Sequence, residues 1–574
     1  MLALVAANCA AQGDLRVTPG RFLIDPPTLE NLGFRWFIEG DSNRNASVSV
    51  AYRKGGESTW RQAQPMLRVH NEVVNQQFAA HRVGNLFAGS VLFLEPSTTY
   101  EVRFVMRDPD GGAPAPTTVI ASTRGEPRAW SGGRTIHVFP NAPPGLMASY
   151  ESAQPGDVLL LHGGIYKTPA PLELTRSGEA GKPIVFRGAG DGEAILEGQG
   201  HEVDLLRIAR ADHLMFENLT LRRARFAIRA GEKGGPGASG LTVRRCRIEN
   251  VVYGIGNTSD KANNWYIADN HIIGINPQWY PRPTDGSYMK PGHTGVNGYG
   301  RGHVVCHNRI ERFSDSLAIA NYGIPPADVE KHAVSIDFYN NDLSDAQDDT
   351  LETDYGCHNI RVYRNRCHNA HTGISVQPLY GGPVYLIRNE LYAITSLTFK
   401  WHNFSAGIIA YHNTLASAGS GFRSFDRWQN GHLRNNLIMG GRGSGPPLPA
   451  MSTGTITPYS TLDYNGYRDN GAEKLIRWFD GTRESFHATL AEFTKATGYE
   501  RHGVMVDYDV FQRAGPPLAG RSYEPADWDV RLKPGTAAVD AGVVLPNIND
   551  GFRGKAPDLG SHELGAPPPH YGPR

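Results

Sequence analysis

The sequence predicts an all-β protein in which a small β-sandwich precedes a right-handed parallel β-helix. An asparagine followed by a polar and then an apolar residue recurs at a constant interval, at Asn341, Asn365, Asn389 and Asn413, and Asn436 follows one position short of that interval. The interval matches one coil of a parallel β-helix, which takes about 24 residues and stacks its strands roughly 4.8 Å apart. The 66 glycines and 39 prolines, beside a 40% hydrophobic content, also favour a turn-rich β protein over a disordered one.

The N-terminal part is expected to be a signal remnant followed by a sandwich. Residues 1–13 are mostly small and apolar, as in the tail of a secretory signal, which predicts a secreted or periplasmic protein. Residues 14–125 contain alternating strand patterns. Tyr100, which follows Leu-Glu-Pro-Ser-Thr-Thr, resembles the tyrosine corner of a fibronectin type III domain, with Trp36 as the expected core tryptophan.

The β-helix is predicted over residues 133–485. Its opening stretch, AQPGDVLLLHGGIYKTP at 153–169, resembles the entrance of many secreted β-helix proteins. We interpret the repeated asparagines as structural, because an asparagine at a turn can bond the backbone of the next coil. Asn308, Asn270 and Asn218 are expected to continue this series upstream.

Wider gaps between the asparagines predict inserted loops, which on a solenoid usually wall a groove. The larger surplus falls at 276–293 and the smaller at 323–332. Trp279 and Tyr288 in the first loop are candidates for stacking on sugars, or for packing onto the helix surface.

The C-terminal part is expected to hold a helix and a capping segment, at 486–565. Residues 532–565 resemble the closing segment of bacterial β-helix polysaccharide lyases. We interpret Asp540, Asp550 and Asp558 as turn formers in a cap over the end coil, since glycines flank this stretch. Residues 566–574 are predicted to form a disordered tail.

Overall charge excludes some partners. The chain carries 57 basic and 57 acidic residues, whereas a nucleic-acid or membrane-surface binder needs a basic excess. The five cysteines form no CxxC pair, so zinc or redox chemistry is unsupported. We expect a monomer whose partner is a polysaccharide.

Ionisable residues gather on four neighbouring coils, at 348–354, 373–377, 396–402 and 421–427. Because side chains alternate along a strand, those between the apolar residues of each coil are expected to point away from the core. Two registers are possible. One stacks Asp354, Gln377 and Lys400 in a column, and the other aligns Glu352, Lys400 and Arg423. The outward set comprises Glu352, Asp354, Gln377, Lys400 and Arg423.

Aromatic residues crowd the same region and suggest sugar recognition. Tyr380, Trp401 and Trp428 are candidate substrate-binding residues, together with Gln377 and Arg427. His402 is a candidate proton donor, although a lone histidine is more often structural.

One mechanism that fits is β-elimination on a uronate. It needs a base, an acid for the leaving oxygen and a cation to neutralise the carboxylate. Lys400 and Arg423, about one coil apart, are similar to the lysine base and following arginine of chondroitinase B-like and alginate lyases. That resemblance implies Lys400 as the base and a Ca²⁺ ion near acids, for which Asp348, Glu352 and Asp354 are the candidates.

Other interpretations stay open. Asp348, Asp349, Glu352 and Asp354 offer carboxylate pairs for a glycoside hydrolase, and an adhesive solenoid would bind glycans without cleaving them. The charged strip could also be a solvated network of salt bridges. The sequence therefore predicts a carbohydrate-active enzyme, with a lyase on an acidic polysaccharide ahead of a hydrolase.

Overall fold

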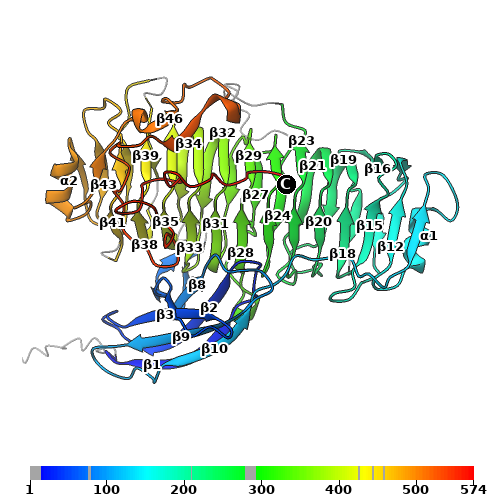
Figure 1. Cartoon of the computed structure of the whole chain (residues 1–574), viewed down its shortest axis with the longest axis horizontal. Helices are drawn as coiled ribbons and strands as arrows, with labels where there is room; N and C mark the ends of the chain where they lie inside the picture. Colours follow the sequence, from blue (N-terminus) through cyan, green and yellow to red (C-terminus); the bar gives the residue numbers. More distant parts are fainter. Residues whose placement is uncertain are drawn as a thin grey trace, which may run out of the picture.

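The structure is a computed structural model, and it describes residues 14–574 except 75–78, 209, 278–291, 425–426, 442–444 and 457–458. Residues 1–13, with the predicted signal remnant, lie outside this range, as do Trp279 and Tyr288. The all-β prediction of a parallel β-helix after a small sandwich is confirmed (Figure 1).

The sandwich packs two antiparallel sheets around one apolar core. Trp36 is buried in that core, and the Tyr100 hydroxyl accepts a hydrogen bond from the backbone N–H of Glu95 at 2.9 Å, as in a tyrosine corner. Whether the sandwich belongs to the fibronectin type III family stays a prediction. The two sheets consist of β1 (Val17–Ile24), β2 (Leu32–Gly40), β8 (Asn85–Val91) and β5 (Leu67–His70), and of β10 (Thr117–Ser122), β9 (Thr99–Arg107), β3 (Ser47–Lys54) and β4 (Arg61–Gln62).

The solenoid begins at Thr135 and is built on two long parallel sheets whose strands alternate along the chain. The first sheet runs through β11 (Thr135–Val138), β12 (Val158–Leu161), β15 (Ile184–Gly188), β18 (Leu214–Glu217), β20 (Thr242–Arg244), β22 (Tyr266–Ala268), β25 (Val304–Cys306), β28 (Val334–Tyr339), β31 (His358–Tyr363), β33 (Val384–Ile387), β35 (Ala406–Tyr411), β38 (Gln429–Arg434) and β41 (Thr461–Asp463).

The second sheet is the longer of the two. It runs through β13 (Gly164–Lys167), β14 (Leu172–Leu174), β16 (Ala194–Gly200), β17 (Leu206–Ile208), β19 (Thr220–Arg229), β21 (Arg247–Asn257), β23 (His271–Gly274), β24 (Thr294–Gly298), β26 (Arg309–Glu311), β27 (Asp315–Ala318), β29 (Asp342–Ser344), β30 (Asp349–Glu352), β32 (Arg366–Val376), β34 (Glu390–Trp401), β36 (Thr414–Ser417), β39 (Leu437–Met439), β42 (Gly466–Tyr467) and β45 (Val504–Met505). A short sheet extends it with β37 (Phe422–Arg423), β40 (Met451–Gly454), β43 (Ile476–Phe479) and β44 (Glu484–His487).

Stacked side chains hold the coils together from inside. Leu343, Cys367, Leu391, Leu415 and Ile438 pair one after another and are fully buried. Burying each such side chain contributes about 1.5–3 kcal/mol. Cys367 is a free thiol, so it forms no bridge with Cys357.

The asparagine ladder is structural, as the sequence predicts. The Asn389 side-chain oxygen accepts the backbone N–H of Asn365 at 3.1 Å, and its Nδ2 donates to the carbonyl of Val362 at 2.9 Å. The same pattern runs from Asn270 to Asn465. The residue before each ladder asparagine has a φ between 53° and 59°, which makes a tight corner. Asn218 does not join the ladder, because it occupies that corner position itself.

Figure 1 shows the sandwich resting against one side of the solenoid, below β33 and β28. Buried polar groups join the two parts. Asn31 donates to Asp337 at 2.7 Å, Asp337 pairs with Arg361, and Arg361 donates to Ser90 at 3.1 Å. The sandwich is thus fixed to the solenoid rather than tethered by a loose linker.

The C-terminal segment follows the side of the solenoid instead of capping its end. The predicted helix is present as α2 (Leu490–Thr497), with Thr489 as N-cap and Gly498 as C-cap, and Phe493 packs on the last coils. The chain then returns along the surface through β46 (Phe511–Arg513) and β47 (Asp529–Leu532). Asp540 accepts the backbone N–H of Lys555, in keeping with a turn-forming role.

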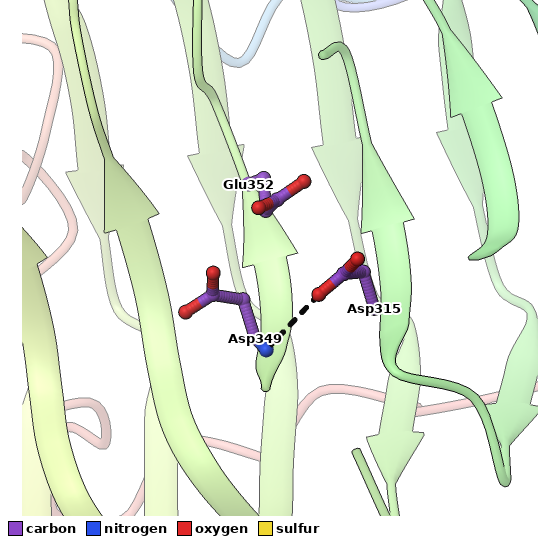
Figure 2. A group of neighbouring side chains, drawn as sticks. All are labelled: Asp315, Asp349 and Glu352. Atoms are coloured by element: carbon purple, nitrogen blue, oxygen red, sulfur yellow. Dashed lines mark hydrogen bonds between the residues drawn. The ribbon is translucent and has the colours of Figure 1, made fainter. Parts of the chain in front are cut away.

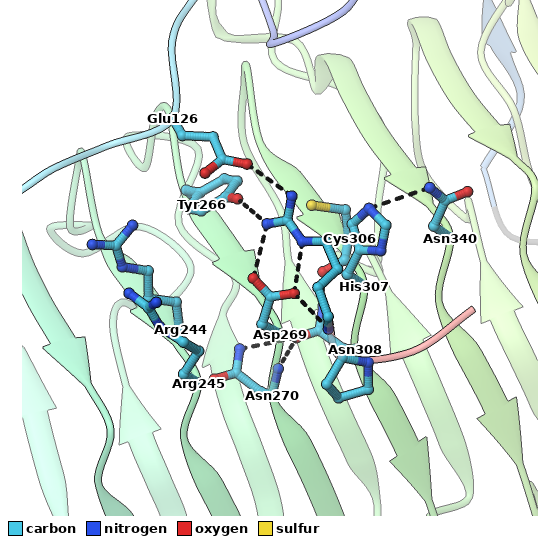
Figure 3. Close-up of polar contacts among 12 residues, drawn as sticks. Glu126, Arg244, Arg245, Tyr266, Asp269, Asn270, Cys306, His307, Asn308 and Asn340 are labelled. Carbon is cyan, nitrogen blue, oxygen red and sulfur yellow. Dashed lines mark hydrogen bonds and ion pairs between the residues drawn. The ribbon is translucent and has the colours of Figure 1, made fainter. Parts of the chain in front are cut away.

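The last residues, predicted to be disordered, instead pack against the solenoid. Arg574 pairs with Asp269 at 2.8 Å and with Glu126 at 3.0 Å. Figure 3 shows Glu126, Asp269 and Tyr266 gathered at this place, near the hydrogen bond between Asn270 and Asn308. No helix in the described part of the chain is long and apolar enough to span a membrane.

Candidate functional site

A row of outward side chains crosses neighbouring coils of the second sheet. Ala318 on β27 pairs with Glu352 on β30, which pairs with Ser375 on β32, which pairs with Lys400 on β34. Leu317, Leu351, Ile374 and Phe399, one position earlier, point into the core. The register counted from the asparagines is therefore the one the structure has for Glu352 and Lys400. The alternative column fails because Lys400 pairs with Ser375, not with Gln377.

Three carboxylates meet beside this row. Asp315, Asp349 and Glu352 each have an oxygen within 4.8 Å of the other two, and Figure 2 shows them on adjacent strands. Asp315 also accepts the backbone N–H of Asp349 at 3.3 Å. Thr350, the next residue on the strand, donates its hydroxyl to the carbonyl of Gly373 on the following coil. We call Asp315, Asp348, Asp349 and Glu352 the acid cluster.

Lys400 supplies the positive charge next to the acid cluster. Its ammonium is hydrogen-bonded to Asp349 and lies 4.0 Å from Asp348, and its side chain is 13% exposed. Burial lowers the pKa of Lys400, but Asp349, Asp348, Asp354 and Glu352 outweigh burial and hold that pKa well above its ordinary value. Lys400 is therefore a cation while these acids are ionised.

The carboxyl groups resist losing their protons. Burial, reinforced by the charges of Asp349 and Asp348, raises the pKa of Asp315 well above its ordinary value. Burial likewise raises the pKa of Asp349, despite the opposing charge of Lys400, and burial with the charge of Asp315 raises that of Glu352. Several buried acids facing one lysine need further positive charge to ionise together.

Asp354 lies beside the cluster but is turned toward the next coil. Its carboxylate accepts the Ser375 hydroxyl at 2.9 Å and the backbone N–H of Gln377 at 2.8 Å. Burial raises the pKa of Asp354 to about 7. Of the predicted metal ligands, Glu352 belongs to the group of three, Asp348 adjoins it, and Asp354 has other partners.

The donor set fits a hard divalent cation. The groups are carboxylate oxygens, which Ca²⁺ prefers. Asp349 is fully buried, and its second oxygen, Oδ1, has no hydrogen-bond partner. A buried, unpaired carboxylate oxygen costs free energy unless a proton or a cation satisfies it. The charges and the unpaired oxygen thus favour an ion among these carboxylates.

A groove of about 590 Å³ runs from the acid cluster toward the N-terminal coils. Asp315, Asp348 and Glu352 form one end of it. Along its wall, the rings of Phe226 and Tyr253 stack at 4.2 Å and those of Tyr253 and His293 at 5.0 Å. The acid cluster is thus accessible from a channel that could hold an extended molecule.

Several predicted substrate-binding residues are structural instead. Trp401 and Trp428 are fully buried, because both rings pack inside the solenoid. Tyr380 is 2% exposed at the contact with the sandwich, where its hydroxyl donates to the carbonyl of Gly323. These three residues cannot stack on a sugar.

The remaining candidates occupy the neighbouring surface. Gln377 adjoins Asp354, and His402 follows at the end of β34, where its backbone N–H donates to the carbonyl of Val376 at 3.2 Å. Arg423 and Arg427 line a separate pocket further along the solenoid. A role for His402 in proton transfer stays a prediction.

Asp315 was missed by sequence reasoning, although a signal for it exists. Its offset from Asn308 is the same as the offset of Asp348 from Asn341. Counting from the asparagines would have aligned Asp315 with Asp348, one residue short of the register in the structure, where Leu317 pairs with Leu351 and Asp315 lies opposite Asp349. The surrounding letters, Phe-Ser-Asp-Ser, otherwise look like an ordinary turn.

The fold and the site define a β-solenoid with a buried acid–lysine cluster beside a groove. No protein-family model matches the chain, and no curated protein matches its sequence.

Solved structures to which the chain is similar include pectate lyase Pel9A, with 15% identity over 76% of this chain and 97% of that one, at a TM-score of 0.42. A Family 28 exopolygalacturonase of Yersinia enterocolitica aligns with 9% identity over 80% and 96% of the two chains, at a TM-score of 0.30. An alginate lyase from Paenibacillus sp. str. FPU-7 aligns with 14% identity over 57% and 93%, at a TM-score of 0.25.

Proposed function

We propose that the protein is a lyase that cleaves an acidic polysaccharide by β-elimination. In this proposal Asp315, Asp349 and Glu352 hold a Ca²⁺ ion, and Lys400 is the base. The observation that supports it most is the ammonium of Lys400 paired with Asp349 inside a cluster of carboxylates at the end of a groove.

Each part of the reaction has a matching group. When bound, Ca²⁺ would supply the positive charge that neutralises a uronate carboxylate and so acidifies the neighbouring C5 proton. Lys400 removes that proton, the electron pair of the C5–H bond forms the C4–C5 double bond, and the C4–O4 bond breaks. The departing oxygen takes a proton, for which His402 is the candidate.

The charge of a bound ion would affect the pKa of Lys400. A free amine is needed for proton removal, yet the surrounding acids keep the pKa of Lys400 high. A cation bound by Asp349 and Glu352 would offset the negative charge of these acids. Burial would then be the larger influence on Lys400, and burial lowers its pKa. The proposal therefore predicts that activity depends on the metal even where substrate still binds.

The hydrolase alternative has weaker geometric support. Inverting glycosidases hold their two carboxyl groups about 6.5–9.5 Å apart and retaining ones about 5–5.5 Å apart. Oxygens of Asp315, Asp349 and Glu352 lie within 4.8 Å of one another, which is the close approach expected around an ion.

The test is an assay on polygalacturonate, alginate and chondroitin, with Ca²⁺ or with a chelator. New ultraviolet absorbance from unsaturated uronate is expected in the presence of Ca²⁺ on at least one of these polymers. Lys400→Ala should lower that rate by about 10²–10⁴-fold, which is the contribution of general acid–base catalysis. Lys331→Ala, at an exposed lysine that does not line the groove, is the matched control.

Other outcomes would contradict the proposal. Reducing ends without the absorbance would indicate hydrolysis. Full activity in Lys400→Ala, with an unchanged thermal midpoint, would remove Lys400 from the role of base. We further propose that the protein is exported, because residues 2–11 have the character of a signal and an acidic polysaccharide is an extracellular substrate.

A further inference from the structure

The outward row that contains Lys400 continues toward the C-terminal coils, where two of its next three residues are arginines. The hydroxyl of Ser424 donates to the carbonyl of Trp401 at 2.6 Å, and that of Thr398 donates to the carbonyl of Gly421, so Arg423 lies one coil after Lys400. Arg423 then pairs with Ser452, and Ser452 pairs with Arg477. The row therefore reaches Arg477 three coils, or about 14 Å, beyond Lys400.

These side chains point away from the core. Phe422, Met451 and Ile476, one position earlier on the same strands, are fully buried in the solenoid. Alternation along a strand then directs Arg423, Ser452 and Arg477 to the surface. The row thus changes from acidic, at Glu352, to basic beyond Ser375.

Three arginines surround one pocket on this surface. Arg423, Arg427 and Arg477 line a cavity of about 310 Å³ together with Ser452, Phe479 and Glu484. We call it the arginine pocket. Among the lining residues that the structure describes, Glu484 alone carries a carboxylate.

Contacts within the pocket hold two of the guanidinium groups in place. That of Arg427 lies over the ring of Phe479, 4.1 Å from its centre, and that of Arg477 pairs with Glu484 at 2.6 Å. Burial and the charge of Arg477 lower the pKa of Arg423. Like charges held close together favour an anion between them, and guanidinium groups suit carboxylate and sulfate because they can donate two parallel hydrogen bonds.

We propose that the arginine pocket is a subsite that binds an anionic group of the polysaccharide, one to three coils from Lys400 along the solenoid axis. This inference rests on the proposed function, because the chain would pass from the groove over Lys400 to the pocket. It makes the preferred substrate a polyanion whose charges recur along the chain, rather than a neutral glycan with a single charged residue.

The test uses binding as well as activity. Arg477→Gln removes a charge of the pocket without touching Lys400 or the acid cluster. The control is Arg483→Gln, whose side chain is 81% exposed on the turn just before Glu484. Affinity for oligogalacturonate is measured by calorimetry in the Lys400→Ala background, with a methyl-esterified oligomer as neutral ligand and a sulfated oligomer as the second anion.

Arg477→Gln should weaken binding of the anionic oligomers by about tenfold, which is the loss of one charge-assisted contact. It should leave the methyl-esterified oligomer unaffected and make binding less sensitive to salt, and Arg483→Gln should change nothing. In the active enzyme Arg477→Gln should raise KM for long chains and leave kcat unchanged.

Two failures are distinguishable. Equal affinities of Arg477→Gln and Arg483→Gln for both anions would overturn the subsite, even if the enzyme is a lyase. Absence of lyase activity, with the tenfold binding loss still present, would overturn the proposed reaction and leave the pocket as a site for anionic glycans. A stronger effect on the carboxylated or on the sulfated oligomer would identify which anion the pocket takes.

Discussion

Two rows of polar side chains run along the solenoid: one repeats the same residue at every coil and the other does not. The asparagine ladder repeats one residue type at a buried corner, and each asparagine bonds the backbone of its neighbour. The outward row changes at every coil, from Glu352 through Ser375 and Lys400 to Arg423, Ser452 and Arg477. Beside the outward row, the buried Oδ1 of Asp349 has no hydrogen-bond partner.

The difference separates structure from function. The side chain of each ladder asparagine uses its hydrogen bonds on the backbone of the neighbouring coils, so it offers no polar group to a ligand. A row that abandons the repeat and leaves like charges close together carries a free-energy cost, which a ligand can relieve. Stability measurements on variants at or beside the two rows test this contrast.

Asn389→Ala should lower the free energy of unfolding by about 3–5 kcal/mol. It leaves the N–H of Asn365 and the carbonyl of Val362 buried without partners, and each such group costs about 1–3 kcal/mol. Urea titration measures the change, with Asn43→Ala at an exposed position of the sandwich as control. A loss below about 1 kcal/mol would show that the ladder is dispensable.

Glu500→Gln should remove a pH dependence of stability. Glu500 ends the ladder, accepting from Asn465 at 2.7 Å and from Tyr467 at 2.8 Å, and burial raises its pKa to about 7. Because this pKa is raised above the unfolded value of 4.5, the stabilising contribution is complete below pH 4.5 and is lost as pH rises through about 7.

Relative to Glu500→Gln, wild type should therefore lose about 3 kcal/mol between pH 4.5 and pH 8. Paired urea titrations of the two proteins at these pH values measure it. Parallel curves for the two proteins would mean that Glu500 titrates normally.

Saturating Ca²⁺ should stabilise the wild type by about 2.7 kcal/mol at 100 times its dissociation constant. Asp349→Asn should abolish most of this gain, because it removes the fully buried ligand at the centre of the acid cluster. Thermal unfolding with and without chelator provides the measurement, and Glu202→Gln, at an exposed acid elsewhere, is the matched control. An unchanged gain in Asp349→Asn would place the ion somewhere else.

Ser452→Ala should change the free energy of unfolding by less than about 0.5 kcal/mol, since the outward row contributes little to the packing of the coils. The same urea titration as for Asn389→Ala checks it. A loss comparable to that of Asn389→Ala would erase the distinction between the two rows.

Sequence reasoning placed Glu352 and Lys400 on one outward strip but did not find every acid that the structure brings beside them. The regular period of the asparagines predicted the register of Glu352 and Lys400, because coils of equal length stack residue upon residue. It missed Asp315, which lies in the longer coil between Asn308 and Asn341, where the extra length breaks the count. It also assigned Trp401 and Trp428 to the surface, although both lie in the core.

A local period and alternation along each strand are enough to predict the solenoid, its asparagine ladder and the strip of ionisable residues from the sequence. Which acids meet depends on the tertiary structure, because Asp315, Asp349 and Lys400 lie on three different strands, β27, β30 and β34, that come together only in the folded solenoid. The tertiary structure also placed the C-terminal segment along the side of the solenoid. Such contacts join residues far apart in the chain, and no local pattern specifies them.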